Sequence, residues 1–146
     1  MKFKFKLAPV LKVREHEEEQ QKMRFAAALQ KKTDLQRHAE SIEQDLETIN
    51  GRDIRQDEMT PAVFQRHYAS IHQKHQELQK VQHNIAKAEK EVVTEREKLI
   101  EANMRTKMIK TLENKERENF LAELQRVEQN QLNEIATQMY NSPRGK

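Results

Sequence analysis

Four histidines lie close together near the middle of the sequence, where their spacing could suit a metal ion. His72 and His75 are three residues apart and would share one face of a helix, and His67 and His83 lie nearby. The alternative is structural, with His75 in a polar layer of a helix contact opposite Leu35 and the others exposed. The sequence contains no cysteine, so thiolate ligands are excluded. We favour the structural interpretation and expect neither a metal nor a cofactor.

No other group of residues has the composition of a catalytic site. Gly51 and Gly145 are the only glycines and cannot form a phosphate-binding loop, and a thiol nucleophile is excluded. Carboxylates are numerous, but on thin helices they would face solvent outside any pocket. Nucleic-acid binding needs a continuous basic face or stacking aromatics, whereas both charges are mixed along the chain and it has five Phe and two Tyr. We therefore predict neither an enzyme nor a nucleic-acid-binding protein.

The composition predicts an all-α protein with a thin core. Only 35% of the 146 residues are hydrophobic and 35% are charged, which is too little apolar material for a thick globular core. Good helix formers dominate, with two glycines and three prolines. No apolar run approaches the roughly 18 residues of a membrane span, and the basic start lacks the apolar stretch of a signal peptide. We expect a cytoplasmic protein.

Helix breakers divide the sequence into two long segments. Pro9 suits the first turn of a helix, where its missing N–H costs nothing. Asn50-Gly51 is a stop signal, Thr60-Pro61 is a cap followed by a first helical residue, and Asn141-Ser142-Pro143 ends the pattern. We predict a single domain over 1–146, with helices over about 8–50 and 61–140, a connector over 51–60 and a disordered tail over 141–146.

Both segments carry a heptad stripe of apolar residues. In the first, the stripe follows alternating steps of three and four, broken only by Lys32: Phe25, Ala28, Leu35, Ala39, Ile42, Leu46 and Ile49. In the second, it consists of Ile71, Leu78, Val81, Ile85, Ala88, Val92, Leu99 and Ala102. Because an apolar stripe on a lone helix would stay in water, the two should pair. The prediction is an antiparallel coiled-coil hairpin.

The helix lengths predict a register and an unpaired extension. With a short connector, Ile42 should lie beside Tyr68 and Phe25 beside Ile85, while Leu11 meets Leu99 and Arg14 faces Glu95. The second helix is longer, and its strict heptads end near Ala102, so the remainder should extend as an overhang that a partner covers or through which the chain self-associates. There, Met104, Met108 and Met139 are either an adaptable binding surface or ordinary contact-filling residues.

The N-terminal part of the first helix should pair more weakly than the part near the connector. Arg14, Glu18 and Gln21 stand where the stripe needs apolar residues, so we expect the helices to separate there or the polar groups to reach water. Residues 1–14 also carry lysine and arginine without any acid. This end could meet an acidic partner, membrane phosphate or nucleic acid, or it could be a plain solvated terminus.

Both ends of the sequence resemble those of the FliJ family of flagellar export proteins. The start, KFKFKLAPVLKVREHEEEQ, matches at Phe3, Phe5, Leu7, Val10, Leu11, Arg14, Glu17 and Glu18. The end, EQNQLNEIA, matches at Glu128, Leu132, Glu134, Ile135 and Ala136, with Asn133 where the family usually has Asp and Asn130 where it usually has Lys. Phe64 and Tyr68 fit the start of the family's second helix. The similar length and architecture extend the resemblance over nearly the whole chain.

The resemblance implies a non-enzymatic component of the flagellar type III export apparatus. Family members are similar in shape to the central stalk of rotary ATPases, bind the hexameric export ATPase, contact the cytoplasmic domain of the membrane export gate and handle export chaperones. They would associate with the membrane only through partners, at the flagellar base. Transferred to this chain, the ATPase-binding residues would be Leu11, Arg14, Leu132, Glu134, Ile135 and Met139. The export-gate-binding residues would be Phe64, Tyr68, His72 and His75.

Two other functions fit a helical hairpin. A prefoldin-like chaperone would need β-hairpins between its helices, for which residues 51–60 leave little room. A generic structural coiled coil would simply dimerise through its stripe. A monomer in solution favours the stalk-like role, and a tight dimer favours the structural one.

Overall fold

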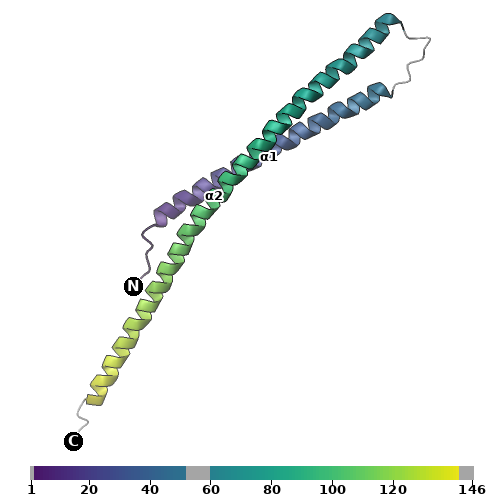
Figure 1. Ribbon diagram of the computed structural model, residues 1–146. Helices are drawn as coiled ribbons and strands as arrows, with labels where there is room; N and C mark the ends of the chain where they lie inside the picture. The colour runs from purple at the N-terminus through teal and green to yellow at the C-terminus, as the bar shows by residue number, and fades with distance from the viewer. Residues whose placement is uncertain (1, 52–59, 142–146) are drawn as a thin grey trace. The chain divides into compact units, whose positions relative to one another are not determined.

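Two long helices account for nearly all of the computed structural model, which describes residues 2–51 and 60–141 (Figure 1). Helix α1 (Ala8–Asn50) has 43 residues and helix α2 (Pro61–Asn141) has 81, and the two pack against each other. The all-α prediction, the helix bounds and the longer second helix are confirmed. Most of the predicted connector and the predicted disordered tail lie outside the described residues. No helix in the described ranges has the length and apolar content needed to cross a bilayer.

Local sequence signals place the helix ends. Pro9 lies in the first turn of α1, where helical N–H groups have no intrahelical acceptor. The hydroxyl of Thr60 accepts a hydrogen bond from the N–H of Val63 at 3.2 Å, which satisfies one of the free donors at the start of α2. At the other end of α1, the Gly51 N–H still donates to the Glu47 carbonyl at 2.8 Å, and the helix stops there.

The chain contacts itself in two compact units, which we call the hairpin unit (Glu19–Glu101) and the terminal unit (Met1–Glu18 and Ala102–Lys146). In the hairpin unit the two helices run antiparallel, because Lys31 pairs with Glu91 while Asp45, later in α1, pairs with the earlier Lys74. Its core is a buried cluster of Ala39, Ile42, Leu46 and Val81, against which Ile71, Leu78 and Ile85 pack. These are the apolar stripes expected from the heptads.

The predicted register is wrong, although the predicted stripes are right. Phe25 lies with its ring 5.7 Å from the guanidinium of Arg96 instead of beside Ile85, a displacement of about three helical turns. Tyr68 is 64% exposed instead of covering Ile42. Arg14 pairs with Glu17 at 3.1 Å, not with Glu95. The prediction assumed that the two helices begin level across the connector, whereas the pairing of Asp45 with Lys74 puts the end of α1 level with about the third turn of α2.

In the terminal unit the contact stripe of α2 continues well past Ala102. The least exposed positions follow steps of three and four: Ala102, Thr106, Ile109, Glu113, Glu116 and Phe120. Residues 2–18 cover this face, since Glu18 contacts Asn103 and Phe3 contacts Phe120. The expectation that the paired region ends near Ala102 is therefore wrong. We call residues 121–141, which follow Phe120, the overhang.

Candidate partner-binding surfaces

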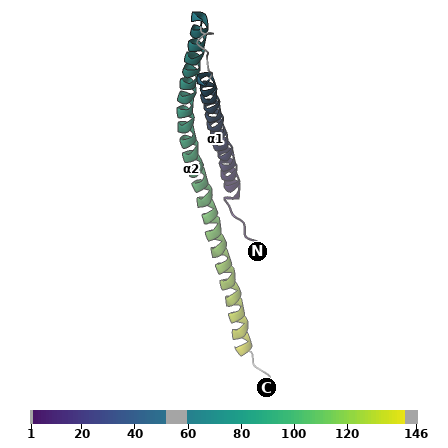
Figure 2. The same cartoon turned by 90° about the vertical axis from the view of Figure 1, so that its right-hand side faces the viewer.

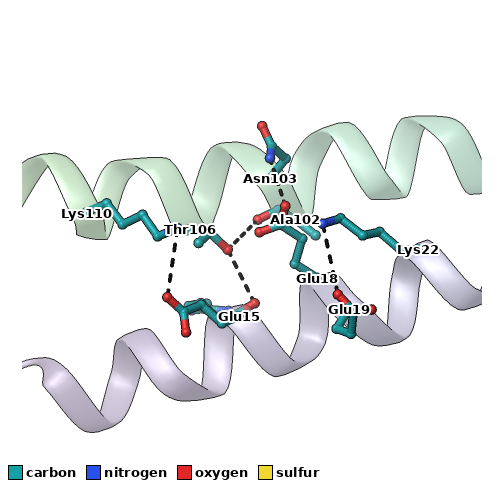
Figure 3. Close-up of polar contacts among 9 residues, drawn as sticks. Glu15, Glu18, Glu19, Lys22, Ala102, Asn103, Thr106 and Lys110 are labelled. Atoms are coloured by element: carbon teal, nitrogen blue, oxygen red, sulfur yellow. Dashed lines mark hydrogen bonds and ion pairs between the residues drawn. The ribbon is translucent and has the colours of Figure 1, made fainter.

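Polar contacts join the two segments of the terminal unit (Figure 3). The Thr106 side chain, only 2% exposed, donates from its hydroxyl toward the carbonyl oxygens of Ala102, at 3.1 Å, and Arg14, at 3.3 Å. The Asn103 amide donates to the Glu18 carboxylate at 2.8 Å. The Lys110 ammonium lies 3.9 Å from the Glu15 carboxylate. Among the described residues of this unit, Thr106 is the one buried position, so a polar side chain stands where the hairpin unit buries apolar ones.

The polar residues that interrupt the α1 stripe are accommodated by hydrogen bonds. In the hairpin unit, the Gln21 amide donates to the Glu95 carbonyl at 3.2 Å and to the Glu95 carboxylate. Among the described residues, no buried side-chain nitrogen or oxygen lacks a partner. At Glu18 and Gln21 the expected separation of the helices is wrong, because Asn103 and Glu95 of the other helix satisfy these groups. Arg14 pairs with Glu17 of its own helix, and its side chain stays 36% exposed, as the expected access to water allowed.

The N-terminal segment before α1 contributes aromatic anchors that the helix periodicity did not predict. Phe3 packs on Phe120 with ring centroids 5.6 Å apart, and the Arg117 guanidinium lies 5.5 Å from the Phe3 ring centroid. Phe3 and Phe5 are half-buried, while Lys2, before Phe3, and Lys4, between the two rings, are exposed. The signal in the sequence is this alternation of Lys and Phe, since a period of two indicates an extended segment with one covered face.

The apolar side chains of the overhang are exposed, with the exception of the half-buried Leu124. Leu132, Ile135 and Met139 are 59%, 53% and 65% exposed. In Figure 2 the yellow end of α2 runs without another segment beside it. Leu121, Leu124, Glu128, Leu132, Ile135 and Met139 follow steps of 3-4-4-3-4, in place of the regular heptad of the paired regions. A lone helix with an apolar stripe is weakly stable, so a partner on this face would stabilise it.

The six residues assigned to ATPase binding lie in the terminal unit at two separate places. Leu132, Glu134, Ile135 and Met139 are exposed on the overhang. Leu11 and Arg14 are half-buried on α1, and the Arg14 carbonyl oxygen is bonded to Thr106. At about 1.5 Å per residue, Thr106 lies roughly 40 Å along α2 from Leu132. The two groups share a unit but do not form one continuous patch.

The four residues assigned to the export gate lie in the hairpin unit, in the first four turns of α2. Phe64, Tyr68, His72 and His75 are all exposed, and the His72 ring stacks on Tyr68 at 6.3 Å with an interplanar angle of 4°. The structural interpretation of His75 is wrong, because the half-buried contact position is Lys74, which pairs with Asp45 at 3.5 Å. The described residues hold no group of three or more metal-ligating side chains.

Comparison with protein-family models gives a match that covers almost the whole chain. The family model described as "Flagellar FliJ protein" matches residues 3–145. Searches of the curated proteins and of the solved structures return no match. The chain therefore belongs to the FliJ family, a non-catalytic component of the flagellar export apparatus.

Proposed function

We propose that the chain acts as a stalk-like adaptor that binds the hexameric export ATPase through its terminal unit and the export gate through the start of α2. The observation that supports ATPase binding most directly is the exposed apolar face of the overhang, at Leu132, Ile135 and Met139. Exposed apolar faces of this kind on a soluble helix usually mark a protein interface. Leu11 and Arg14 would form a second contact nearer the paired part of the unit.

The ATPase contact can be tested with two substitutions on the overhang. The double variant Leu132→Asp/Ile135→Asp replaces apolar groups by carboxylates that would be desolvated in an interface. Loss of such anchors typically costs 2 kcal/mol or more, so we expect the dissociation constant for the purified ATPase to rise by about thirtyfold or more. Surface plasmon resonance with the full chain would measure it.

A matched control has the same chemistry at exposed apolar positions elsewhere. Met23→Asp/Val93→Asp changes two exposed residues of the hairpin unit, one on each helix, and should leave ATPase affinity unchanged. Equal affinity of the overhang variant and the unaltered chain would remove the ring-facing role from Leu132 and Ile135. Circular dichroism of both variants would show whether helix content is retained.

The gate contact is assigned to the uncovered first turns of α2. Aromatic side chains are frequent anchors in protein interfaces, and Phe64 and Tyr68 are exposed here beside the stacked His72. Phe64→Ala/Tyr68→Ala should weaken binding of the gate's purified cytoplasmic domain by about tenfold or more, while leaving ATPase binding intact. Weakening of both partners together would mean that the two sites are not separate.

The adaptor role places the protein on the cytoplasmic face of the membrane at the flagellar base, where export chaperones would also reach it. Membrane association would be peripheral and would depend on partners. A generic structural coiled coil is the competing function, and light scattering distinguishes the two. A monomer leaves the overhang available for the ATPase, whereas a tight dimer through the overhang would occupy it.

A further inference from the structure

The terminal unit has a second apolar surface, distinct from the overhang. An open groove of about 640 Å³ lies along α2 between Met104 and Lys115. Its lining is Met104, Lys107, Met108, Ile109, Thr111, Leu112 and Lys115, all from this one helix. Met104 and Met108 are 58% and 69% exposed, so the groove floor is apolar and open to solvent.

Apart from Ile109, which also belongs to the stripe that residues 2–18 cover, the groove lies on a different face of α2. The contact face passes through Thr106, which bonds to Arg14, and through Glu113. Met104, Met108, Thr111 and Lys115 repeat in steps of four and three, which defines a separate stripe one to two residues away around the helix. No described residue outside α2 lines it. Methionines suit such a surface because their flexible, polarisable side chains adapt to a partner.

The charges around the groove are positive. Lys107 and Lys115 line it, and neither forms an ion pair with any described residue. Lys110, by contrast, is turned to the other side and lies 3.9 Å from Glu15. Between Met104 and Lys115 the one acidic residue is Glu113, which lies on the contact face and pairs with Arg117 at 3.1 Å. An apolar floor with unpaired lysines at its sides is complementary to an apolar stripe flanked by carboxylates.

We propose that the groove between Met104 and Lys115 binds an acidic amphipathic helix of a partner protein. Apolar side chains at successive turns of that helix would pack on Met104, Met108 and Leu112, and flanking Glu or Asp would pair with Lys107 and Lys115. The groove is about 16 Å long, which corresponds to about three helical turns of the partner. This site adds a third surface to the proposed function and does not depend on the ATPase or gate assignments.

The chain's own overhang is the alternative occupant, in a second copy of the chain, but its geometry fits poorly. The overhang carries Glu128 and Glu134 beside its apolar stripe, so its charge would suit. At about 100° per residue, however, Leu121 and Met104 are separated by about a quarter turn around α2. In a symmetric antiparallel pair each helix presents one face to the other. The apolar stripe of the overhang and the stripe of the groove could therefore not both lie in that contact.

Two designed peptides test the site on the full chain. One is an acidic amphipathic helix of about 14 residues, with leucines on one face and glutamates on both flanks, and the other has lysine in place of every glutamate. Fluorescence anisotropy would give their affinities. We expect the acidic peptide to bind at least about tenfold more tightly, and Lys107→Glu/Lys115→Glu to reverse this preference. Met104→Gln/Met108→Gln should weaken the acidic peptide by about tenfold.

Matched controls are Lys80→Glu/Lys87→Glu and Met23→Gln, which alter exposed residues of the hairpin unit and should leave both affinities unchanged. Circular dichroism would confirm that every variant is folded. Equal binding of the two peptides, or an unchanged preference after charge reversal, would overturn the proposal. So would a dimer by light scattering that Met104→Gln/Met108→Gln converts to monomer, since that result would assign the groove to a second copy.

Discussion

The two units of this chain use the same helical pairing with different side chains. In the hairpin unit the contact is built from Ala39, Ile42, Leu46 and Val81, which exclude water and have no polar role. In the terminal unit the corresponding face mixes apolar Ile109 and Phe120 with Thr106, which is bonded across to Arg14, and Glu113. Apolar burial supplies most of the stability of a helix pair, whereas hydrogen bonds contribute less net free energy each.

This difference separates a stabilising region from a region available for partners. The hairpin unit holds the helices together, so the terminal unit can leave the apolar side chains of its overhang uncovered. Elements that bind partners are commonly drawn from the less stable parts of a protein. The predictions below test whether stability and exposure are divided between the units in this way.

The largest expected effect on the free energy of unfolding comes from shortening a side chain in the apolar cluster of the hairpin unit. Ile42 is 2% exposed, and Ile42→Ala would remove buried methyl groups and leave a cavity, with an expected loss of about 3 kcal/mol in the free energy of unfolding. Ile135→Ala on the overhang should change it by less than about 0.5 kcal/mol. Urea denaturation followed by circular dichroism measures both, and similar losses would contradict the division between units.

A second, smaller effect is expected where a polar pair interrupts the apolar contact. Gln21→Leu would leave the half-buried Glu95 carboxylate without its amide donor, with only Lys98 at 3.8 Å, at a cost of about 1–2 kcal/mol. Gln21→Leu/Glu95→Leu removes both polar groups and should be neutral or stabilising. Urea midpoints for Gln21→Leu, Glu95→Leu and the double variant form the test. A stabilising Gln21→Leu single variant would show that the pair contributes nothing.

In the terminal unit, the N-terminal segment should detach when its aromatic anchor is removed. Phe3→Ala deletes the ring contacts with Phe120 and Arg117, worth about 1 kcal/mol. The expected result is faster amide hydrogen exchange at Ala8 and Leu11, whose N–H groups donate to the Phe5 and Leu7 carbonyls, with no change in the hairpin unit. Lys4→Ala, at the exposed neighbour, is the control and should leave exchange unaltered. Equal exchange in both variants would mean that Phe3 does not anchor the segment.

The smallest effect is expected for surface ion pairs. Lys31 and Glu91 lie 3.5 Å apart across the helices of the hairpin unit, with both side chains more than half exposed. Lys31→Ala should lower the free energy of unfolding by less than about 0.5 kcal/mol, because water and salt screen the pair. Urea denaturation at low and high salt would measure this loss. A loss near that of Ile42→Ala would mean that ion pairs stabilise this unit as much as its apolar core does.

The sequence was sufficient to predict the elements but not their alignment. Pro9, Asn50-Gly51 and Thr60-Pro61 are local signals, so they located the helix ends to within a residue or two. The heptads identified Ile42 and Val81 as contact residues for the same reason. A heptad repeat has no unique register, however, because each shift by seven residues again places contact positions opposite each other. The register therefore depended on an assumption about the connector, and that assumption failed.

The candidate surfaces were predicted unevenly. The exposed overhang follows from unequal helix lengths, although its start moved from Ala102 to Leu121 because the extended segment around Phe3 covers more of α2. A search for helical periods passed over that segment, whose period is two. The grouping of Leu11 with Leu132 came from the family resemblance alone. The predicted pairing of Leu11 with Leu99 already implied a separation of roughly 50 Å from Leu132 along α2.

The cross-helix hydrogen bonds also oppose a shift of one helix along the other. If the helices of the hairpin unit slipped by one heptad, apolar positions would still meet apolar positions, but Gln21 would face Ala88 and its amide would lose the Glu95 acceptor. In the terminal unit, Glu18 would likewise lose the Asn103 donor. These bonds therefore specify a single offset between the helices. The polar residues that form them stand at positions where apolar residues would have buried more apolar surface.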